Sequence, residues 1–183
     1  MERAADLFAK RGIGGTSLDE VLAAAKAGKG QFYHYFRSRD ELAAAAVGYR
    51  CAQVLAGLTR ALGGVSSLAG LEQALAAFIA GFEQMGMPGC PIGTLATEVA
   101  VRNEDARLQA AAGFDAWERL LADALERMRQ RGELRADAEP AVLATGLLAS
   151  IEGGMVLSQT RKGIASLRIA VEAGIAHVRA YLA

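Results

Sequence analysis

The sequence contains few of the residues that build metal centres and disulfide scaffolds. Only 2 cysteines and 2 histidines occur among its 183 residues, which excludes a disulfide-dense scaffold and offers no metal-ligand spacing. With so few cysteines we expect a reducing, cytoplasmic setting. Prolines are scarce as well, at 3, so long stretches of the chain are free to form helices.

Net charge and long apolar runs are missing too. The 20 Lys and Arg residues balance the 20 Asp and Glu residues, so a nucleic-acid site has to come from a local cluster of basic residues. No run reaches about 18 uninterrupted apolar residues, which predicts no membrane span and no membrane partner. Hydrophobic residues nevertheless make up 52% of the chain, enough for a buried core and too many for a disordered protein.

Helix-forming residues dominate, and no segment alternates with a period of two. We therefore predict an all-α protein of about nine helices. The first helix is expected to span about 2–11 and to end at Gly12. A capping box, Ser17–Glu20, starts the second, a short third spans about 29–36, and Ser38 caps the fourth. The later helices are expected, to within about four residues, at 68–85, 92–101, 104–131, 139–161 and 164–182.

Basic and aromatic residues interleave between residues 26 and 39, where no acidic residue occurs. A three-residue turn at 26–28 joins two of the expected helices there, which is a helix-turn-helix pattern. At about 100° per residue, Phe32 and Phe36 fall on the same side of the second of these helices, and His34 lies opposite. The outward face is therefore polar and aromatic, and its glycine lets the backbone approach a partner closely.

Such a face fits the major groove of B-DNA, which admits one helix and displays hydrogen-bonding groups on the base edges. Gln31 can pair with adenine, and Lys29 or Arg37 can contact guanine or phosphate. Tyrosine, imidazole and hydroxyl groups can bond phosphate oxygens, and Arg39 can clamp the DNA backbone. The alternative for this segment is a solvated, capped corner of a helical bundle. The candidate DNA-binding residues are Thr16, Ser17, Lys29, Gly30, Gln31, Tyr33, His34, Tyr35 and Arg39.

The DNA-binding domain of the TetR family of bacterial transcriptional regulators is similar to two stretches of this chain, "LFAKRGIGGTSLDEVLAAA" and "GKGQFYHYFRSRDEL". The resemblance implies a homodimer. It also implies an N-terminal helix-turn-helix domain of three helices, here 1–43, and a C-terminal helical bundle for ligand binding and dimerisation, here 44–183. By the same resemblance, the residues that face DNA are Lys29, Gln31, Tyr33, His34 and Arg39, and Phe32 and Phe36 lie in the core.

The chain departs from the family's usual pattern at the turn between the two helices. Lys26 stands where the family usually has Gly, so a lysine has to adopt a left-handed backbone conformation at some cost. Gly28 stands where the family usually has Ser, which removes a side-chain N-cap from the third helix. Members of the family usually have several more residues before the first helix, so we expect that Met1 is not the natural start.

A second resemblance concerns residues 89–100, "GCPIGTLATEVA", which are similar to a motif in the LmrA/YxaF-like branch of the family. It implies a regulator that responds to a small molecule. Aromatic and methionine side chains in the bundle can line a cavity for a small apolar or amphipathic ligand, or simply fill the core. Cys90 can be a reactive thiol or a packed one, and Glu152 can pair with a ligand or lie exposed. The candidate ligand-binding residues are Phe78, Phe82, Met85, Cys90, Phe114, Trp117, Glu152 and Met155.

The last two long helices carry apolar stripes, at Val142–Ile151 and Ile164–Leu182, which predict a four-helix homodimer interface. Between them, Gly153 and Gly154 each destabilise a helix interior by about 1 kcal/mol. We therefore expect a partner helix or a ligand to approach this pair of glycines closely.

Paired carboxylates, a nucleophile–base spacing and a phosphate-binding loop are all missing from the sequence, so we expect no enzymatic activity and no cofactor. The predicted function is that of a ligand-responsive homodimeric repressor that binds double-stranded operator DNA. The alternative is a helical small-molecule-binding protein without specific DNA binding, which would show no salt-dependent affinity for DNA.

Overall fold

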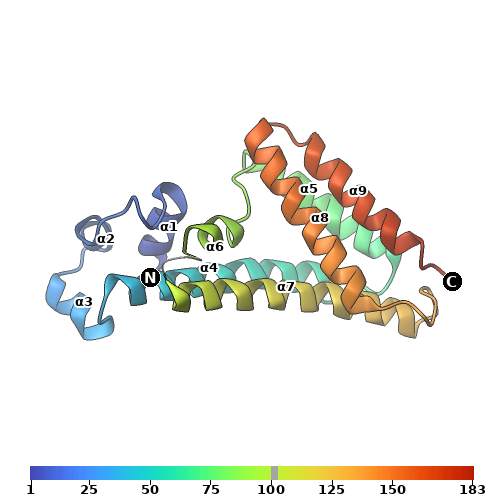
Figure 1. The fold of residues 1–183 in the computed structure, drawn as a ribbon, viewed down its shortest axis with the longest axis horizontal. Coiled ribbons are helices and arrows are strands. Elements are labelled where there is room, and N and C mark those ends of the chain that lie inside the picture. Colours follow the sequence, from blue (N-terminus) through green and yellow to red (C-terminus); the bar gives the residue numbers. More distant parts are fainter. Residues whose placement is uncertain (100–102) are drawn as a thin grey trace. The chain divides into compact units, whose positions relative to one another are not determined.

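The computed structural model describes residues 1–99 and 103–183. These residues contain nine α-helices and no extended strand, which confirms the all-α prediction (Figure 1). The expected end of the sixth helix at residue 101, and Ala100 of the branch motif, lie outside the described residues. The helices are α1 (Glu2–Arg11), α2 (Leu18–Ala25), α3 (Lys29–Tyr35), α4 (Arg39–Leu62), α5 (Leu68–Gln84), α6 (Gly93–Val99), α7 (Glu104–Gln130), α8 (Pro140–Arg161) and α9 (Ala165–Arg179).

The helices belong to two compact units. The first unit consists of Met1–Leu55 and Pro91–Phe114, and the second of Ala56–Cys90 and Asp115–Ala183. Helices α1, α2, α3 and α6 therefore lie in the first unit, and α5, α8 and α9 in the second, while α4 and α7 contribute to both. The first unit includes residues on both sides of residue 43, and the functional boundary expected there stays a prediction.

Buried aromatic side chains from α1 and α3 contribute to the core around the helix-turn-helix. Phe8 of α1 is 1% exposed, and Phe32 of α3 is 5% exposed. Phe36, expected in the core, is only half-buried, and it follows α3 with the extended dihedrals φ −134° and ψ 132°. Its ring still lies beside that of Phe32, with the centroids 5.6 Å apart. Phe32 is therefore the aromatic side chain that anchors α3 to the core.

The turn between α2 and α3 has the two unusual features expected from its sequence. Lys26 ends α2 in the left-handed region, with φ 52° and ψ 41°. Gly28 precedes α3 as its N-cap residue and contributes no side-chain hydrogen bond to it. Both expectations are confirmed, and the turn is held by backbone bonds from the N–H groups of Lys26 and Ala27 to carbonyls of α2.

Two glycines let α8 and α9 pack closely in the second unit. A Cβ at Gly154 would lie 2.9 Å from Leu167 Cα, and one at Gly174 would lie 2.8 Å from Leu147 Cδ1. The expected close approach at Gly154 is therefore made by α9 of the same chain. Gly153, by contrast, is exposed and has no atom within 4 Å of such a Cβ.

The apolar stripes predicted to join two copies of the chain are largely buried within one copy. Leu147 and Ile151 of α8 are each 1% exposed, and Leu167 and Val178 of α9 are fully buried. These side chains pack into the core of the second unit, so the assignment of the dimer interface to them is wrong. Of that stripe on α8, Val142 remains 57% exposed.

Two of the helices have the length and composition of membrane-spanning segments. These are Arg39–Leu62, with a mean hydropathy of 1.2, and Pro140–Arg161, with a mean hydropathy of 1.6. A core helix meets the same test, and α8 buries side chains such as Leu143 and Met155 inside the second unit. The absence of a membrane partner stays a prediction.

The contact at Gly154 can be tested by adding a methyl group. Gly154→Ala is expected to lower the free energy of unfolding by about 1–3 kcal/mol, because the new Cβ meets the backbone of Leu167. Gly81→Ala in α5 is the control: no atom lies within 4 Å of its Cβ position, so alanine should stabilise that helix by up to about 1 kcal/mol. Chemical denaturation measures both, and equal effects would contradict the packing of α8 on α9.

Candidate nucleic-acid interface

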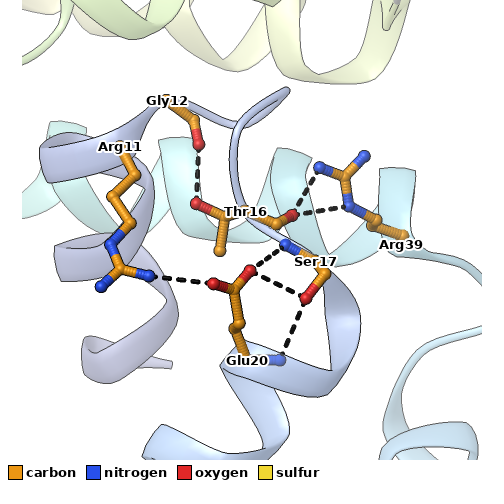
Figure 2. A network of polar contacts seen from close by, with 6 residues as sticks. All are labelled: Arg11, Gly12, Thr16, Ser17, Glu20 and Arg39. Carbon is orange, nitrogen blue, oxygen red and sulfur yellow. Dashed lines mark hydrogen bonds and ion pairs between the residues drawn. The ribbon is translucent and has the colours of Figure 1, made fainter.

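The second helix begins with the capping box expected from the sequence. Ser17 Oγ accepts a hydrogen bond from the Glu20 N–H at 3.2 Å, and Glu20 Oε2 accepts one from the Ser17 N–H at 2.7 Å (Figure 2). Arg11 of α1 donates to Glu20 Oε1 at 2.9 Å. The hydrogen bonds from the backbone and side chain of Ser17, and the charge of Arg11, lower the pKa of Glu20. The N–H and the hydroxyl of Ser17 both donate to Glu20 Oε2 and therefore favour an ionised Glu20.

The loop between α1 and α2 is held by Thr16 and Arg39. Thr16 is 1% exposed, and its hydroxyl donates to the Gly12 carbonyl at 2.8 Å. The Arg39 guanidinium donates to the Thr16 carbonyl, at 2.7 Å from Nη2 (Figure 2). It also donates to the Ile13 carbonyl. The groups of both residues that were expected to meet DNA phosphates are therefore engaged inside the protein.

The other candidate residues lie on the outside of the helix-turn-helix. Tyr33 is 61% exposed and Tyr35 is 67% exposed, although both belong to a helix whose Phe32 is buried. The rings of Tyr33 and Phe32 form a T-shaped pair with their centroids 5.0 Å apart. The rings of His34 and Tyr35 form a second T-shaped pair, with their centroids 4.9 Å apart. Large exposed aromatic side chains next to one another are typical of a binding surface. The exposed candidates are Ser17, Lys29, Gly30, Gln31, Tyr33, His34 and Tyr35.

The helix that carries this exposed face, α3, contains no acidic residue. Lys29 forms an ion pair with Asp19 of α2, with Nζ 3.2 Å from Oδ1 and both side chains largely exposed. Beyond α3, Ser38 Oγ accepts from the Glu41 N–H at 3.1 Å, as expected of a cap, and Glu41 accepts from the Arg37 N–H at 2.6 Å. An exposed pair such as Lys29–Asp19 is weak, so Lys29 can exchange its partner for a phosphate.

Two family models match the chain. Residues 1–46 match the model of bacterial regulatory proteins of the tetR family, and residues 67–173 match that of the C-terminal domain of LmrA/YxaF-like transcriptional regulators. The chain belongs to the TetR family. It is a DNA-binding transcriptional regulator, and both the family and the branch predicted from the sequence are confirmed.

Similar proteins match along most of their length. The HTH-type transcriptional repressor NemR of Escherichia coli (strain K12) is 30% identical over 183 residues, which cover 97% of this chain and 88% of NemR. The HTH-type transcriptional repressor DhaR of Mycobacterium sp. (strain GP1) is 24% identical over 159 residues, 85% of this chain and 78% of DhaR. The crystal structure of the regulatory protein TetR from Rhodobacter sphaeroides has a TM-score of 0.81 and 25% identity, covering 96% and 95% of the two chains.

Only some of the candidate ligand residues of this TetR-family chain are buried in the second unit. In the second unit Phe82, Cys90, Trp117 and Met155 are buried, and the half-buried Phe78 meets Trp117 edge-on at 5.9 Å. Met85 is 69% exposed at the end of α5, and the half-buried Phe114 belongs to the first unit.

Glu152 of α8 has an unusual environment among these candidates. Its Oε1 atom is buried and has no hydrogen-bond partner among the residues that the structure describes. Burial raises the pKa of Glu152, and a hydrogen bond with Cys90 opposes this effect. A buried carboxylate oxygen without a partner is unfavourable, so this position favours either protonation or a donor group from a ligand.

The sequence did not reveal Glu98 of α6, whose carboxylate accepts a hydrogen bond from the Gly14 N–H. A Cβ at Gly12 would lie 3.0 Å from Glu98 Oε1, and one at Gly14 would lie 3.3 Å from it. The two glycines were the available signal, since they permit a close approach to the backbone. Their partner was hidden because it lies 84 residues away in the sequence.

The raised pKa of Glu152 predicts how stability depends on pH. The folded state binds the Glu152 proton more tightly than the unfolded state, so this carboxyl stabilises the fold below its unfolded pKa and loses that effect as pH rises through the folded pKa. Glu152→Gln should therefore become more stable relative to the parent chain as pH rises from about 4 to about 8. Denaturation at several pH values measures this difference. The exposed Asp123→Asn serves as the control, and the same slope for both variants would contradict the burial of Glu152.

Proposed function

We propose that the chain is a ligand-responsive homodimeric repressor of the bacterial cytoplasm, and that α3 enters the major groove of a double-stranded operator. The observation that supports this most is the exposed face of α3, where Tyr33 and Tyr35 project beside Lys29 and Gln31 while Phe32 anchors the helix. A face that is rich in hydrogen-bonding groups and free of acids suits base edges and phosphates.

Each exposed residue of α3 has a proposed role. Gln31 pairs with an adenine edge, and Lys29 meets guanine or phosphate after leaving Asp19. Tyr33, His34 and Tyr35 bond phosphate oxygens, which fixes the position of the helix on the duplex. The exposed Gly30 lets the backbone come close, and Ser17 marks the N-terminus of α2, where free amides favour an anion.

Thr16 and Arg39 act on DNA binding through the loop that they hold. The Thr16 hydroxyl and the Arg39 guanidinium bond to carbonyls of residues 12, 13 and 16. These bonds fix the start of α2 and thereby the helix-turn-helix. We therefore assign both residues to positioning instead of direct contact with phosphate.

An exposed and mostly apolar face of α8 and α9 is the proposed homodimer surface. Val156 and Ile169 are 55% and 71% exposed, and a Cβ at Gly153 would have no neighbour within 4 Å among the other described segments. Small or apolar exposed residues continue this face along both helices, as in Val142, Ala149, Ala165 and Ala173. Exposed apolar stripes of this kind mark protein interfaces, and a twofold pairing of the two helices would form a four-helix interface.

The ligand site is proposed in the second unit, beside Glu152. A ligand with a hydroxyl or amine donor would satisfy Glu152 Oε1, and an apolar body would pack on side chains such as Phe82, Trp117 and Met155. Two recognition helices must match half-sites about 34–36 Å apart. A ligand releases the DNA if it prefers the conformation in which the recognition helices no longer match this spacing. The preference, which is the coupling free energy between the two sites, is typically about 1–3 kcal/mol.

The proposed DNA contacts can be tested with a duplex selected from random sequences by the parent chain. Tyr33→Ala is expected to weaken binding at least tenfold, and Lys29→Ala to reduce the slope of log affinity against log salt by about one. Fluorescence anisotropy at several salt concentrations measures both quantities, while thermal unfolding verifies the fold. Arg119→Ala removes an equal charge from an exposed site on α7 and should leave DNA binding unchanged. A parent chain without salt-dependent affinity would favour the alternative of a ligand-binding protein without DNA binding.

The proposed dimer surface can be tested by adding charge. Ile169→Glu is expected to shift the chain from dimer to monomer in sedimentation experiments at micromolar concentration, because two carboxylates would be buried near the symmetry axis. Leu108→Glu is the matched control, since Leu108 is 49% exposed on α7 in the first unit. A dimer that persists with Ile169→Glu and dissociates with Leu108→Glu would place the interface elsewhere.

A further inference from the structure

The carboxylate of Glu98 occupies a space that only glycine residues leave open. Gly14 donates its N–H to Glu98 Oε1, and Cβ atoms at Gly12 and Gly14 would lie 3.0 Å and 3.3 Å from that oxygen. Gly12 also has φ +77°, a conformation that other residues rarely adopt. The loop is therefore shaped to receive this side chain.

Glu98 and Arg39 hold opposite groups of the same loop. The carboxylate accepts from an amide of the loop, while the guanidinium donates to the carbonyls of Ile13 and Thr16. Charge-assisted bonds of this kind are stronger than neutral ones. Together they fix the short connection that sets the direction of α2, and α2 is joined to α3 by a three-residue turn.

A second polar side chain near α6 bonds to the same part of the first unit. Asn103 Nδ2 donates to the Asp40 carbonyl at 2.9 Å, at the start of α4. Asn103 Oδ1 accepts from the Ala106 N–H at 2.9 Å and so caps α7. Glu98 and Asn103 both belong to the segment that matches the C-terminal domain of the family, yet their bonds reach the helix-turn-helix segment.

We propose that Glu98 is a positioning residue for DNA binding: its carboxylate, bonded to the Gly14 amide, holds the helix-turn-helix in the orientation that the operator requires. This inference rests on the proposed function and adds a residue outside the helix-turn-helix to it. Glu98 does not touch DNA in this proposal. Its negative charge opposes DNA binding, so any gain in affinity that it provides has to come from the bond.

Because the charge of Glu98 weakens DNA binding and its hydrogen bond supports it, two conservative variants can distinguish the two effects. Glu98→Asp keeps the charge but is shorter by one methylene group, so the bond to Gly14 is lost. Glu98→Gln removes the charge but keeps an oxygen that accepts from the amide. We expect the Asp variant to bind the selected duplex about fivefold more weakly than the parent chain, and the Gln variant to bind equally well or more tightly. Asp105→Asn, which changes an exposed acid at the start of α7, is the control for charge alone.

Fluorescence anisotropy gives the affinities, and hydrogen exchange of the Gly14 amide gives a readout that is independent of DNA. Exchange should be faster in Glu98→Asp, which loses the bond, than in Glu98→Gln, which keeps it as a weaker, neutral bond. Equal DNA affinities for the two variants, or a loss that follows their unfolding temperatures, would overturn the role of Glu98. If Tyr33→Ala still weakens binding in that case, the proposed function stands without Glu98. If Tyr33→Ala and the parent chain bind alike, the proposed function itself fails.

Discussion

The short loop between α1 and α2 is the constraint on which the candidate DNA-binding face depends. Three of its residues are glycines, so its own side chains provide little packing beyond the buried Ile13 and Thr16. Its order comes from hydrogen bonds between charged side chains and the backbone, above all those of Arg39 and Glu98. Because α2 begins directly after this loop, those bonds also set where α3 presents its tyrosines.

Features that are fixed within a few residues were predictable from the sequence. The capping box at Ser17 and the cap at Ser38 follow from chemistry within about four positions. The left-handed Lys26 was expected from the resemblance to the TetR family, which usually has Gly at that position. The bond between Glu98 and Gly14 joins residues 84 positions apart, and a single sequence contains no periodic signal for such a pair. The helices were therefore predictable, whereas the contacts that orient them were not.

Helical periodicity also leaves open which copy of the chain covers an apolar face. The stripe with Leu147 and Ile151 satisfied the pattern of an interface, but α8 and α9 bury it within one chain because Gly154 and Gly174 let them approach. The exposed Val156 and Ile169 lie on other faces of the same helices. Residue type predicted that these helices are packed, and only the structure showed which faces remain uncovered.

The ion pair between Lys29 and Asp19 has a consequence for the search along DNA. In the proposed complex Lys29 transfers from the carboxylate to a phosphate, and Asp19 is then left facing a negatively charged strand. Lys29 makes this exchange on any duplex, because every duplex has phosphates. Only the operator also provides favourable contacts to base edges, which compensate for the loss of the ion pair. Together with a net charge of zero, the Lys29–Asp19 pair would shorten the residence time of the regulator on non-specific DNA.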